Sequence, residues 1–178
     1  MSNWRPGEHR PDTASMLRVN QAGEYGATRI YEGQLAVLRR NSAAAKLIAR
    51  MAGQEQRHLD RFNTLMTERG VRPTALQPMW KGAGFALGAV TALISEEAAM
   101  ACTEAVETEI DRHYGRQLEE LGDEDAELAA DIAEFRADEL EHRDVARDAG
   151  AAQAVAYPVL TAVIRGACRL AIGLSKRI

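Results

Sequence analysis

The sequence predicts an all-α fold of one domain, and three observations support this prediction. The composition favours helices, since 46% of the 178 residues are hydrophobic, only 5 are proline, and Ala, Glu, Leu and Arg recur in runs. No segment shows the two-residue alternation with β-branched enrichment that a sheet requires. The length suits a single core closed without disulfides. We therefore expect one helical domain over residues 15–178, preceded by a flexible polar arm over residues 1–14.

Helix start signals and turns divide this domain into four long helices. The first is expected to begin near Thr13 or Ser15, since either hydroxyl can cap a helix N-terminus. It is expected to end before a turn at Asn41 and Ser42. The other three are expected from that turn to about residues 69–70, from Glu96 to about 121–122, and from Asp123 or Asp125 to about Asp148, before Gly150.

The connection between the second and third of these helices is long and contains an apolar segment. Pro73 and Pro78 predict an extended or turn-like chain up to Trp80. Residues 82–95 then carry no charge. Small residues permit close approach of another helix, and this segment contains three glycines: Gly82, Gly84 and Gly88.

Two copies of the motif Glu-x-x-His carry the strongest chemical signal in the chain. They begin at Glu55 and Glu139, and each follows an unpaired glutamate, at a separation of 31 residues in the first case and 32 in the second. A Glu and a His three positions apart share one helix face, so each pair can bind one metal ion while a carboxylate bridges to the other. Glu24 also lies on the apolar stripe of its helix, where a carboxylate needs a partner. The candidate ligands of two metal ions are Glu24, Glu55, His58, Glu107, Glu139 and His142.

Helix geometry determines whether these residues can meet. In one straight helix Glu24 and Glu55 would lie roughly 46 Å apart at about 1.5 Å per residue, so only a hairpin can join them. A turn at Asn41 returns both carboxylates to the same height, and a turn at Gly122 does so for the second pair. The 49 residues that separate the two halves of the ligand set allow a long crossover. The pattern predicts a ferritin-like four-helix bundle with a long crossover and additional amphipathic or apolar helices.

The ligand types indicate which metal such a site would hold. Carboxylates with one imidazole per metal form a hard, oxygen-rich site that suits iron or manganese better than zinc, and iron is favoured if oxygen chemistry follows. Glu24 and Glu107 are expected as outer ligands. Glu55 and Glu139 are expected as bridges, and the two histidines as one nitrogen donor per metal. The alternative is that the motif occurs by chance on solvated helix faces in a chain with 26 acidic residues.

Several neighbouring residues are weaker candidates. Glu104 lies one turn before Glu107 and competes for its role. His113 and Tyr114 follow on the same helix, where they could gate protons or electrons; the alternative is a core tyrosine with a satisfied hydroxyl and a surface histidine. Three further acids are expected to be solvated or paired with basic residues: Glu96, Glu97 and Glu109.

Charge and composition exclude other classes of function. The net charge of −4 argues against a general nucleic-acid binder. Cys102 and Cys168 are expected as buried thiols of a reduced compartment. Residues 1–16 lack the apolar core of a secretory signal, so we expect a bacterial chain on the cytoplasmic side of the membrane or a processed one. The chain has no Gly-x-Gly-x-x-Gly after a strand, and hence no Rossmann site for a nicotinamide.

Two apolar segments have a second interpretation, contact with a membrane. Residues 80–95 are too short to span a bilayer, which takes about 20 residues, but they can lie in its interface. Residues 157–174 are typical of a basic amphipathic helix suited to anionic lipid. Either segment can equally pack against the bundle. The basic residues of the second are Arg165, Arg169, Lys176 and Arg177.

Four stretches together resemble the signatures of the demethoxyubiquinone hydroxylase family. They are VNQAGEYGA at 19–27, QEQRHL at 54–59, AMACTEAVE at 99–107 and DELEH at 138–142, and the resemblance runs from about residue 15 to 178. In that family the metal ligands match the six residues given above, which selects Glu107 over Glu104.

The resemblance implies a ferritin-like di-iron monooxygenase of ubiquinone biosynthesis. Its expected reaction is the O2-dependent hydroxylation of 2-polyprenyl-3-methyl-6-methoxy-1,4-benzoquinol. The expected cofactors are two iron ions, with NADH as a source of electrons. Expected partners are the membrane surface, other ubiquinone-biosynthesis proteins and a reductase. The expected location is the cytoplasmic face of the bacterial cell membrane, or the mitochondrial inner membrane for a processed chain.

Two other functions stay open on the sequence alone. A ferritin-like iron oxidase or peroxide scavenger would use the same six ligands. A non-enzymatic lipid-binding helical bundle would keep the amphipathic segments and bury the acids as structural pairs. An iron oxidase or peroxide scavenger would oxidise iron or peroxide without hydroxylating a quinone. A lipid-binding bundle would contain no iron when purified.

Overall fold

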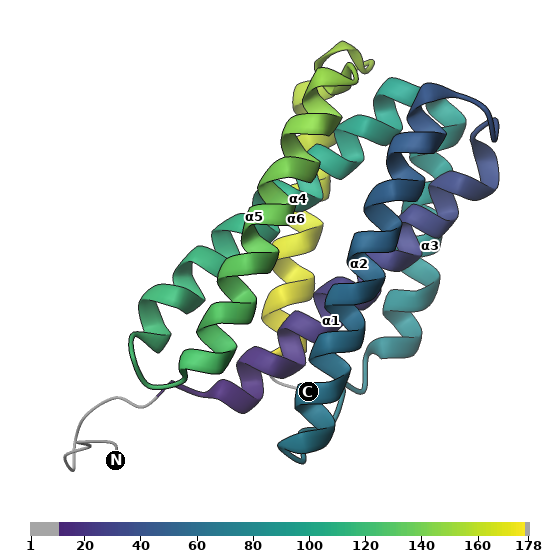
Figure 1. Cartoon of the computed structure of the whole chain (residues 1–178). Helices are drawn as coiled ribbons and strands as arrows, with labels where there is room; N and C mark the ends of the chain where they lie inside the picture. Colours follow the sequence, from purple (N-terminus) through teal and green to yellow (C-terminus); the bar gives the residue numbers. More distant parts are fainter. Residues whose placement is uncertain (1–10, 177–178) are drawn as a thin grey trace.

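The computed structural model describes residues 11–176, and over this range it contains six α-helices, one short 3-10 helix and no strand (Figure 1). The all-α prediction is therefore confirmed. Most of the predicted arm, and Arg177 of the basic segment, lie outside the described residues. The elements are α1 (Thr13–Val37), α2 (Ala43–Glu68), α3 (Gln77–Ile94), α4 (Glu96–Leu121), α5 (Ala126–Asp148), η1 (Ala151–Gln153) and α6 (Tyr157–Ser175).

Side-chain caps explain where the bundle helices begin. Ser42, Ser95 and Asp125 each accept a hydrogen bond from a backbone N–H in the first turn of α2, α4 and α5. Helix α1 begins at Thr13, within the expected range, but the expected cap was wrong, because Asp12 is the cap and its carboxylate accepts from the Ser15 N–H at 2.9 Å. Past the C-terminal ends, three glycines adopt positive φ, which costs a glycine little: Gly70, Gly122 and Gly150.

The two predicted hairpins are present, with α1 packed on α2 and α4 packed on α5. Figure 1 shows them as two pairs of long helices in one bundle. The expectation of an extended chain up to Trp80 was wrong, because α3 already begins at Gln77. Pro78 is compatible with this start, since the first turn of a helix has no use for its missing N–H. Ser95, with φ −173° and ψ 170°, breaks the chain between α3 and α4.

Helix α3 lies against α1 at backbone contact distance. A Cβ added at Gly88 would lie 1.9 Å from the Ile30 carbonyl oxygen, and one at Gly33 would lie 2.1 Å from the Phe85 carbonyl oxygen. Gly84 is also close to α1, whereas a Cβ at Gly82 would meet nothing within 4 Å. The glycine prediction thus holds for two of the three positions. The seam fixes α3 along the outside of α1.

Two apolar clusters fill the bundle above and below a polar layer. One cluster includes Leu17, Phe62 and Ile132. The other includes Ile48 and Met100. Along each of α1, α2 and α5 the candidate ligands fall between residues of the first cluster and residues of the second. The layer is therefore closed off from water at both ends.

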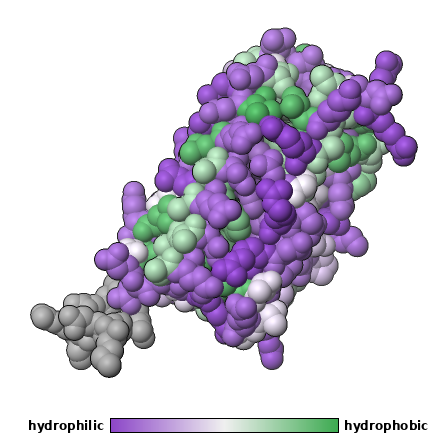
Figure 2. Space-filling model, viewed as in Figure 1, coloured by the Kyte–Doolittle hydropathy of each residue, from purple (hydrophilic) through white to green (hydrophobic). Residues whose placement is uncertain are grey.

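Helix α6 differs from the rest in how little of it is buried. Only Ile164 and Ser175 are buried along its length, while Val159, Val163 and Leu170 are each about two-thirds exposed. Among the described residues it is the one helix long and apolar enough to cross a membrane by length and composition, which is weak evidence by itself. Figure 2 shows that hydrophilic side chains predominate on the visible face of the molecule, with smaller hydrophobic patches.

Both cysteines are free thiols, but the expectation that both are buried holds fully only for Cys102. Cys102 is buried in α4 and Cys168 is partly buried in α6. Burial raises the pKa of each thiol to about 12. Neither thiol is therefore a reactive nucleophile near neutral pH.

Candidate metal centre

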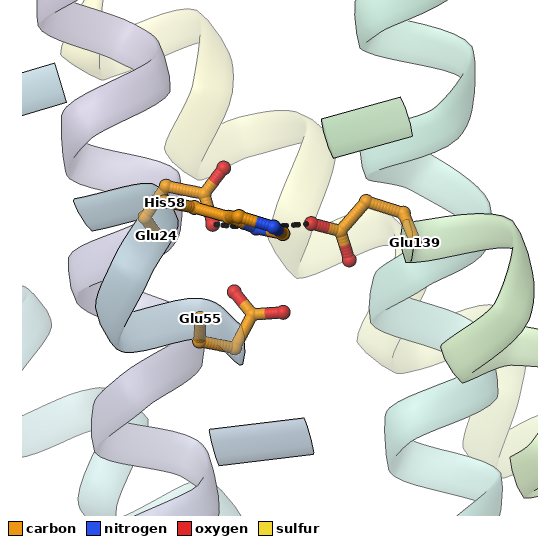
Figure 3. Close-up of side chains that lie close together, drawn as sticks. All are labelled: Glu24, Glu55, His58 and Glu139. Atoms are coloured by element: carbon orange, nitrogen blue, oxygen red, sulfur yellow. Dashed lines mark ion pairs between the residues drawn. The ribbon is translucent and has the colours of Figure 1, made fainter. Parts of the chain in front are cut away.

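The structure brings all six predicted residues into one buried layer. Their ligand atoms form two groups, within each of which the atoms lie within 4.8 Å of one another. Figure 3 shows the first group, in which the side chains from α1, α2 and α5 point toward one another. Glu55 and Glu139 belong to both groups. The first group is Glu24, Glu55, His58 and Glu139; the second is Glu55, Glu107, Glu139 and His142.

Burial of these side chains is nearly complete, since each is at most 1% exposed. An isolated buried carboxylate is costly, and four in one layer repel one another unless a cation or protons balance them. No Lys or Arg is paired with any of these four carboxylates within residues 11–176, and their only cationic neighbours in ion-pair distance are the two histidines. The layer therefore lacks the permanent positive charge that its carboxylates require.

The hydrogen bonds divide the four carboxylates into two kinds. Glu24 and Glu107 each use one oxygen to accept a tyrosine hydroxyl, from Tyr114 and Tyr31 respectively, and each leaves the other oxygen buried without a partner. The central carboxylates, Glu55 and Glu139, leave both oxygens without a partner. An outer carboxylate with one free oxygen suits a terminal ligand, and a central one with two suits a bridge. This division matches the expected roles.

Each histidine turns one ring nitrogen inward and the other outward. The Nδ1 atom of His58 lies 3.3 Å from a Glu139 oxygen, and that of His142 lies 3.1 Å from a Glu55 oxygen. The outward Nε2 atoms lie 3.0 Å from Asp138 Oδ2 and 3.2 Å from Gln54 Oε1. Outer acceptors of this kind hold a ligand imidazole in one tautomer. The inward Nδ1 atoms are thereby left for a metal.

The protonation of the layer reflects crowding of like charges. Burial raises the pKa of Glu55, Glu107 and Glu139 above the usual value, and neighbouring carboxylates raise it further. Burial opposes the charge on His58, but the nearby carboxylates of Glu139 and Glu24 outweigh it and raise its pKa to about 11. For Glu24, burial is likewise outweighed, mainly by the nearby His58 imidazole, and its pKa is lowered. Without a metal, protons supply the missing positive charge.

The two weaker candidates on α4, His113 and Tyr114, have different outcomes. Tyr114 is a buried core tyrosine whose hydroxyl donates to Glu24, so it touches the layer directly. The alternative of a surface histidine is wrong, because His113 is only 4% exposed and its Nε2 lies 3.0 Å from Gln117 Nε2. Sequence reasoning missed the contact of Tyr31 with Glu107. The signal was present, since each tyrosine follows an outer glutamate by seven residues.

The competing acids lie outside the layer. Glu104 accepts from Arg147 and from the Tyr157 hydroxyl. Glu109 accepts from arginines on α4 and α6, as expected for an acid paired with basic residues. Both are as buried as the candidate ligands, but their charges already have partners. Glu104 is therefore not positioned to replace Glu107.

An apolar cavity of about 170 Å³ lies beside the layer, between α1, α3, α4 and α6. Its wall includes Gly23 and Val106, the neighbours in sequence of the two outer glutamates. Trp80 and Leu87 line it from α3, and Cys168 lines it from α6. The cavity thus lies between the bundle helices that carry the two outer glutamates and the two helices that expose the most apolar surface.

Paired Glu-x-x-His motifs and two further glutamates, presented by four helices to a buried interior, are typical of ferritin-like bundles of the carboxylate-bridged di-metal class. The donor set fits such a centre, because it is rich in oxygen and has one free imidazole nitrogen for each group.

The chain belongs to the family of the ubiquinone biosynthesis protein COQ7, whose sequence model matches residues 11–175. It is 51% identical over 175 residues to the 3-demethoxyubiquinol 3-hydroxylase of Rhodospirillum rubrum, covering 97% of this chain and 82% of that protein. It is 51% identical over 167 residues to the human mitochondrial NADPH-dependent 3-demethoxyubiquinone 3-hydroxylase, covering 92% and 76%. The mitochondrial 5-demethoxyubiquinone hydroxylase of Saccharomyces cerevisiae is 45% identical over 179 residues, covering 92% and 77%.

Proposed function

We propose that this chain is a 3-demethoxyubiquinol 3-hydroxylase of ubiquinone biosynthesis that works through a di-iron centre. One observation carries the proposal beyond family membership: the two central carboxylates keep all four oxygens free between two histidine nitrogens. When bound there, two ferrous ions supply two electrons to O2, so that one oxygen atom is added to the quinol ring and the other leaves as water. The ligands are Glu24, Glu55, His58, Glu107, Glu139 and His142.

The residues of the chain hold this centre in one arrangement. The hydroxyls of Tyr31 and Tyr114 fix the outer carboxylates, which leaves each a single oxygen for a metal. Phe135 stacks on the His58 ring at a centroid distance of 4.1 Å and holds its plane. The apolar clusters on both sides exclude water from the centre.

The cavity is the proposed binding site of the quinol ring. It is almost entirely apolar, its wall includes the sequence neighbours of both outer ligands, and it lies between α3 and α6. A polyprenyl tail could leave between these helices, whose exposed apolar side chains include Leu93 and Ile94 on α3 and Val163 on α6. We propose that this face contacts the membrane peripherally, where such a substrate resides. The relatives include a bacterial protein and mitochondrial ones, so the membrane is either the bacterial cell membrane or the mitochondrial inner membrane.

A reduced nicotinamide is the proposed source of electrons. The human relative is named as NADPH-dependent, whereas the sequence led us to expect NADH. Residues 11–176 form no strand, so no Rossmann domain is present in this range. The nicotinamide would therefore act at another surface of the chain, through the quinone, or through a separate reductase.

The decisive experiment supplies purified protein with Fe(II), a reductant, a short-chain demethoxyquinol and ¹⁸O2, followed by mass spectrometry. We expect one ¹⁸O atom in the quinone product. Iron oxidation or peroxide consumption without that product would indicate an iron oxidase or peroxide scavenger. A protein that binds no iron would indicate a lipid-binding bundle. The variant Glu139→Ala should lose bridged iron and activity while its helix content is retained.

A second measurement tests the cavity itself. A Cβ at Gly26 would meet no atom within 4 Å, and this residue lines the cavity, so Gly26→Leu should fill the proposed ring site without a backbone clash. Gly53→Leu is the matched control, because Gly53 is an exposed helical glycine with equally open space. We expect hydroxylation to fall in the first variant alone, with iron content unchanged in both. Equal activity in the two variants would place the ring elsewhere.

A further inference from the structure

The outer partners of the two histidines are exchanged between the two motifs. Asp138 immediately precedes Glu139, yet it faces the His58 Nε2 at 3.0 Å on the other hairpin. Gln54 immediately precedes Glu55, yet its Oε1 faces the His142 Nε2 at 3.2 Å. Each Glu-x-x-His helix therefore supplies a central carboxylate to the shared layer and an outer acceptor to the opposite histidine.

The tyrosine contacts show the same exchange. Tyr31 follows Glu24 by seven residues and donates to Glu107, whereas Tyr114 follows Glu107 by seven residues and donates to Glu24. Both halves of the centre thus have the same donors: an outer glutamate held by a tyrosine, two shared carboxylates and one imidazole. The two halves differ in the charge of the group that faces the outward histidine nitrogen. This group is the Asp138 carboxylate for His58 and the neutral Gln54 amide for His142.

This difference acts directly on the ligand nitrogen. An imidazole that donates its N–H to a carboxylate is a more basic ligand at its other nitrogen than one that donates to an amide, because the anion stabilises positive charge on the ring. The Asp138 side chain is 28% exposed, so it lies at the outer edge of the layer, whereas His58 is buried within it. Stacking of Phe135 keeps the His58 ring in the plane of this contact. His58 is accordingly the stronger donor of the two histidines.

We propose that Asp138 and Gln54 are positioning residues that make the two metal sites unequal, so that the first metal ion binds on the Glu24–His58 side and the second on the Glu107–His142 side. This inference rests on the proposed di-metal function. It deepens that function by assigning an order of loading to a centre whose direct ligands are symmetric.

Substoichiometric loading tests the proposal without any turnover. Crystals of the chelated protein are equilibrated with one equivalent of Co(II) per chain, and anomalous diffraction gives the occupancy of each site. We expect most of the Co(II) beside His58. Asp138→Asn keeps the shape and an acceptor oxygen but removes the charge, so the affinity for the first equivalent should fall by on the order of 10-fold and the occupancies should approach each other.

The reciprocal variant gives the sharper result. In Gln54→Glu/Asp138→Asn the total charge is kept and the carboxylate moves to the other histidine, so the first equivalent should move beside His142. Glu141→Gln, an exposed acid-to-amide change on the same helix, is the matched control and should leave the preference unaltered. Equal occupancy in the unaltered protein, or a preference that stays beside His58 in the double variant, would overturn the inference. Absence of bound metal in the unaltered protein would instead overturn the proposed function.

Discussion

Helix α4 carries buried glutamates of two opposite kinds, and the contrast separates a binding site from a structural contact. Glu107 faces the layer and Glu109 faces α6, two residues along; they are 1% and 2% exposed. Glu109 is surrounded by guanidinium groups of Arg112, Arg165 and Arg169. Glu107 meets a tyrosine hydroxyl on one oxygen and leaves the other unpartnered. Burial alone therefore does not identify a ligand, whereas burial without a fixed cation does.

The largest expected effect comes from Glu107→Gln. The amide keeps the contact with Tyr31 but removes an anionic metal donor, so the second metal ion should be lost. Hydroxylation should fall by more than about 100-fold, because loss of a direct ligand should exceed the effect of losing a residue that only hydrogen-bonds a ligand. The free energy of unfolding of the chelated protein should not decrease, because the neutral amide replaces a carboxyl group whose ionisation the crowded layer opposes. Metal analysis, turnover and urea denaturation measure the three quantities. Full metal content in this variant would contradict the assignment.

The matched change Glu109→Gln should have the reverse profile. It leaves guanidinium groups beside a neutral amide, so the free energy of unfolding should decrease by about 2 kcal/mol. The decrease stays moderate because Arg112 and Arg169 reach solvent and can be hydrated. Two metal ions per chain should still bind. Faster hydrogen exchange along α6 would locate the loss at the α4–α6 seam. If this variant lost metal instead, the distinction between the two glutamates would be wrong.

The sequence was sufficient to predict the bundle and the meeting of the six residues in one layer, because both follow from helix periodicity. Residues at three- and seven-residue spacing must share a face, and turns at equal distances must bring Glu24 level with Glu55. The start of α3 was not predictable in the same way. Pro78 signals both an extended chain and a helical first turn, and the glycine seam with α1 decides between them.

The partners of the layer could not be predicted, because they come from the opposite hairpin. Nothing local indicates that Asp138 contacts His58, since the two are 80 residues apart and their contact depends on how the hairpins cross. The same holds for Glu104, whose partners Arg147 and Tyr157 lie on α5 and α6. Sequence reasoning rejected it as a ligand only through family resemblance, whereas the structure gives the physical reason.

The stability of the chelated protein should depend on pH through the buried layer. Above pH 6.5 the folded, chelated protein keeps a proton on His58, whose pKa is about 11, and burial raises the pKa of Glu55 and Glu107 as well. The folded state then binds more protons than the unfolded state, so stability is lost as pH rises, by about 1.4 kcal/mol per pH unit for each extra proton. The lowered pKa of Glu24 acts only in acid, below its ordinary value of 4.5.

Urea denaturation at pH 7 and pH 9, with chelator and with saturating metal, tests this sign. The free energy of unfolding should fall between these pH values in the chelated protein and change less when metal replaces the protons. Metal binding at pH 7 should release protons, which a weakly buffered indicator solution would report. A chelated protein that became more stable toward pH 9 would contradict the protonated layer.

The smallest effect is expected at the start of α6, where Tyr157→Phe removes one of the two partners of Glu104. The hydroxyl donates to Glu104 Oε2 at 2.8 Å, while Arg147 keeps its bonds to Oε1 at 2.7 and 2.9 Å. Since the carboxylate keeps its cation, the free energy of unfolding should decrease by only about 1 kcal/mol.

Val159→Ala on the same helix is the control, because that side chain is 65% exposed and contributes little packing. Hydrogen exchange should accelerate in the first turns of α6 for Tyr157→Phe and stay unchanged near Glu107. A loss as large as that of Glu109→Gln would mean that the hydroxyl, rather than the guanidinium, holds this end of the seam.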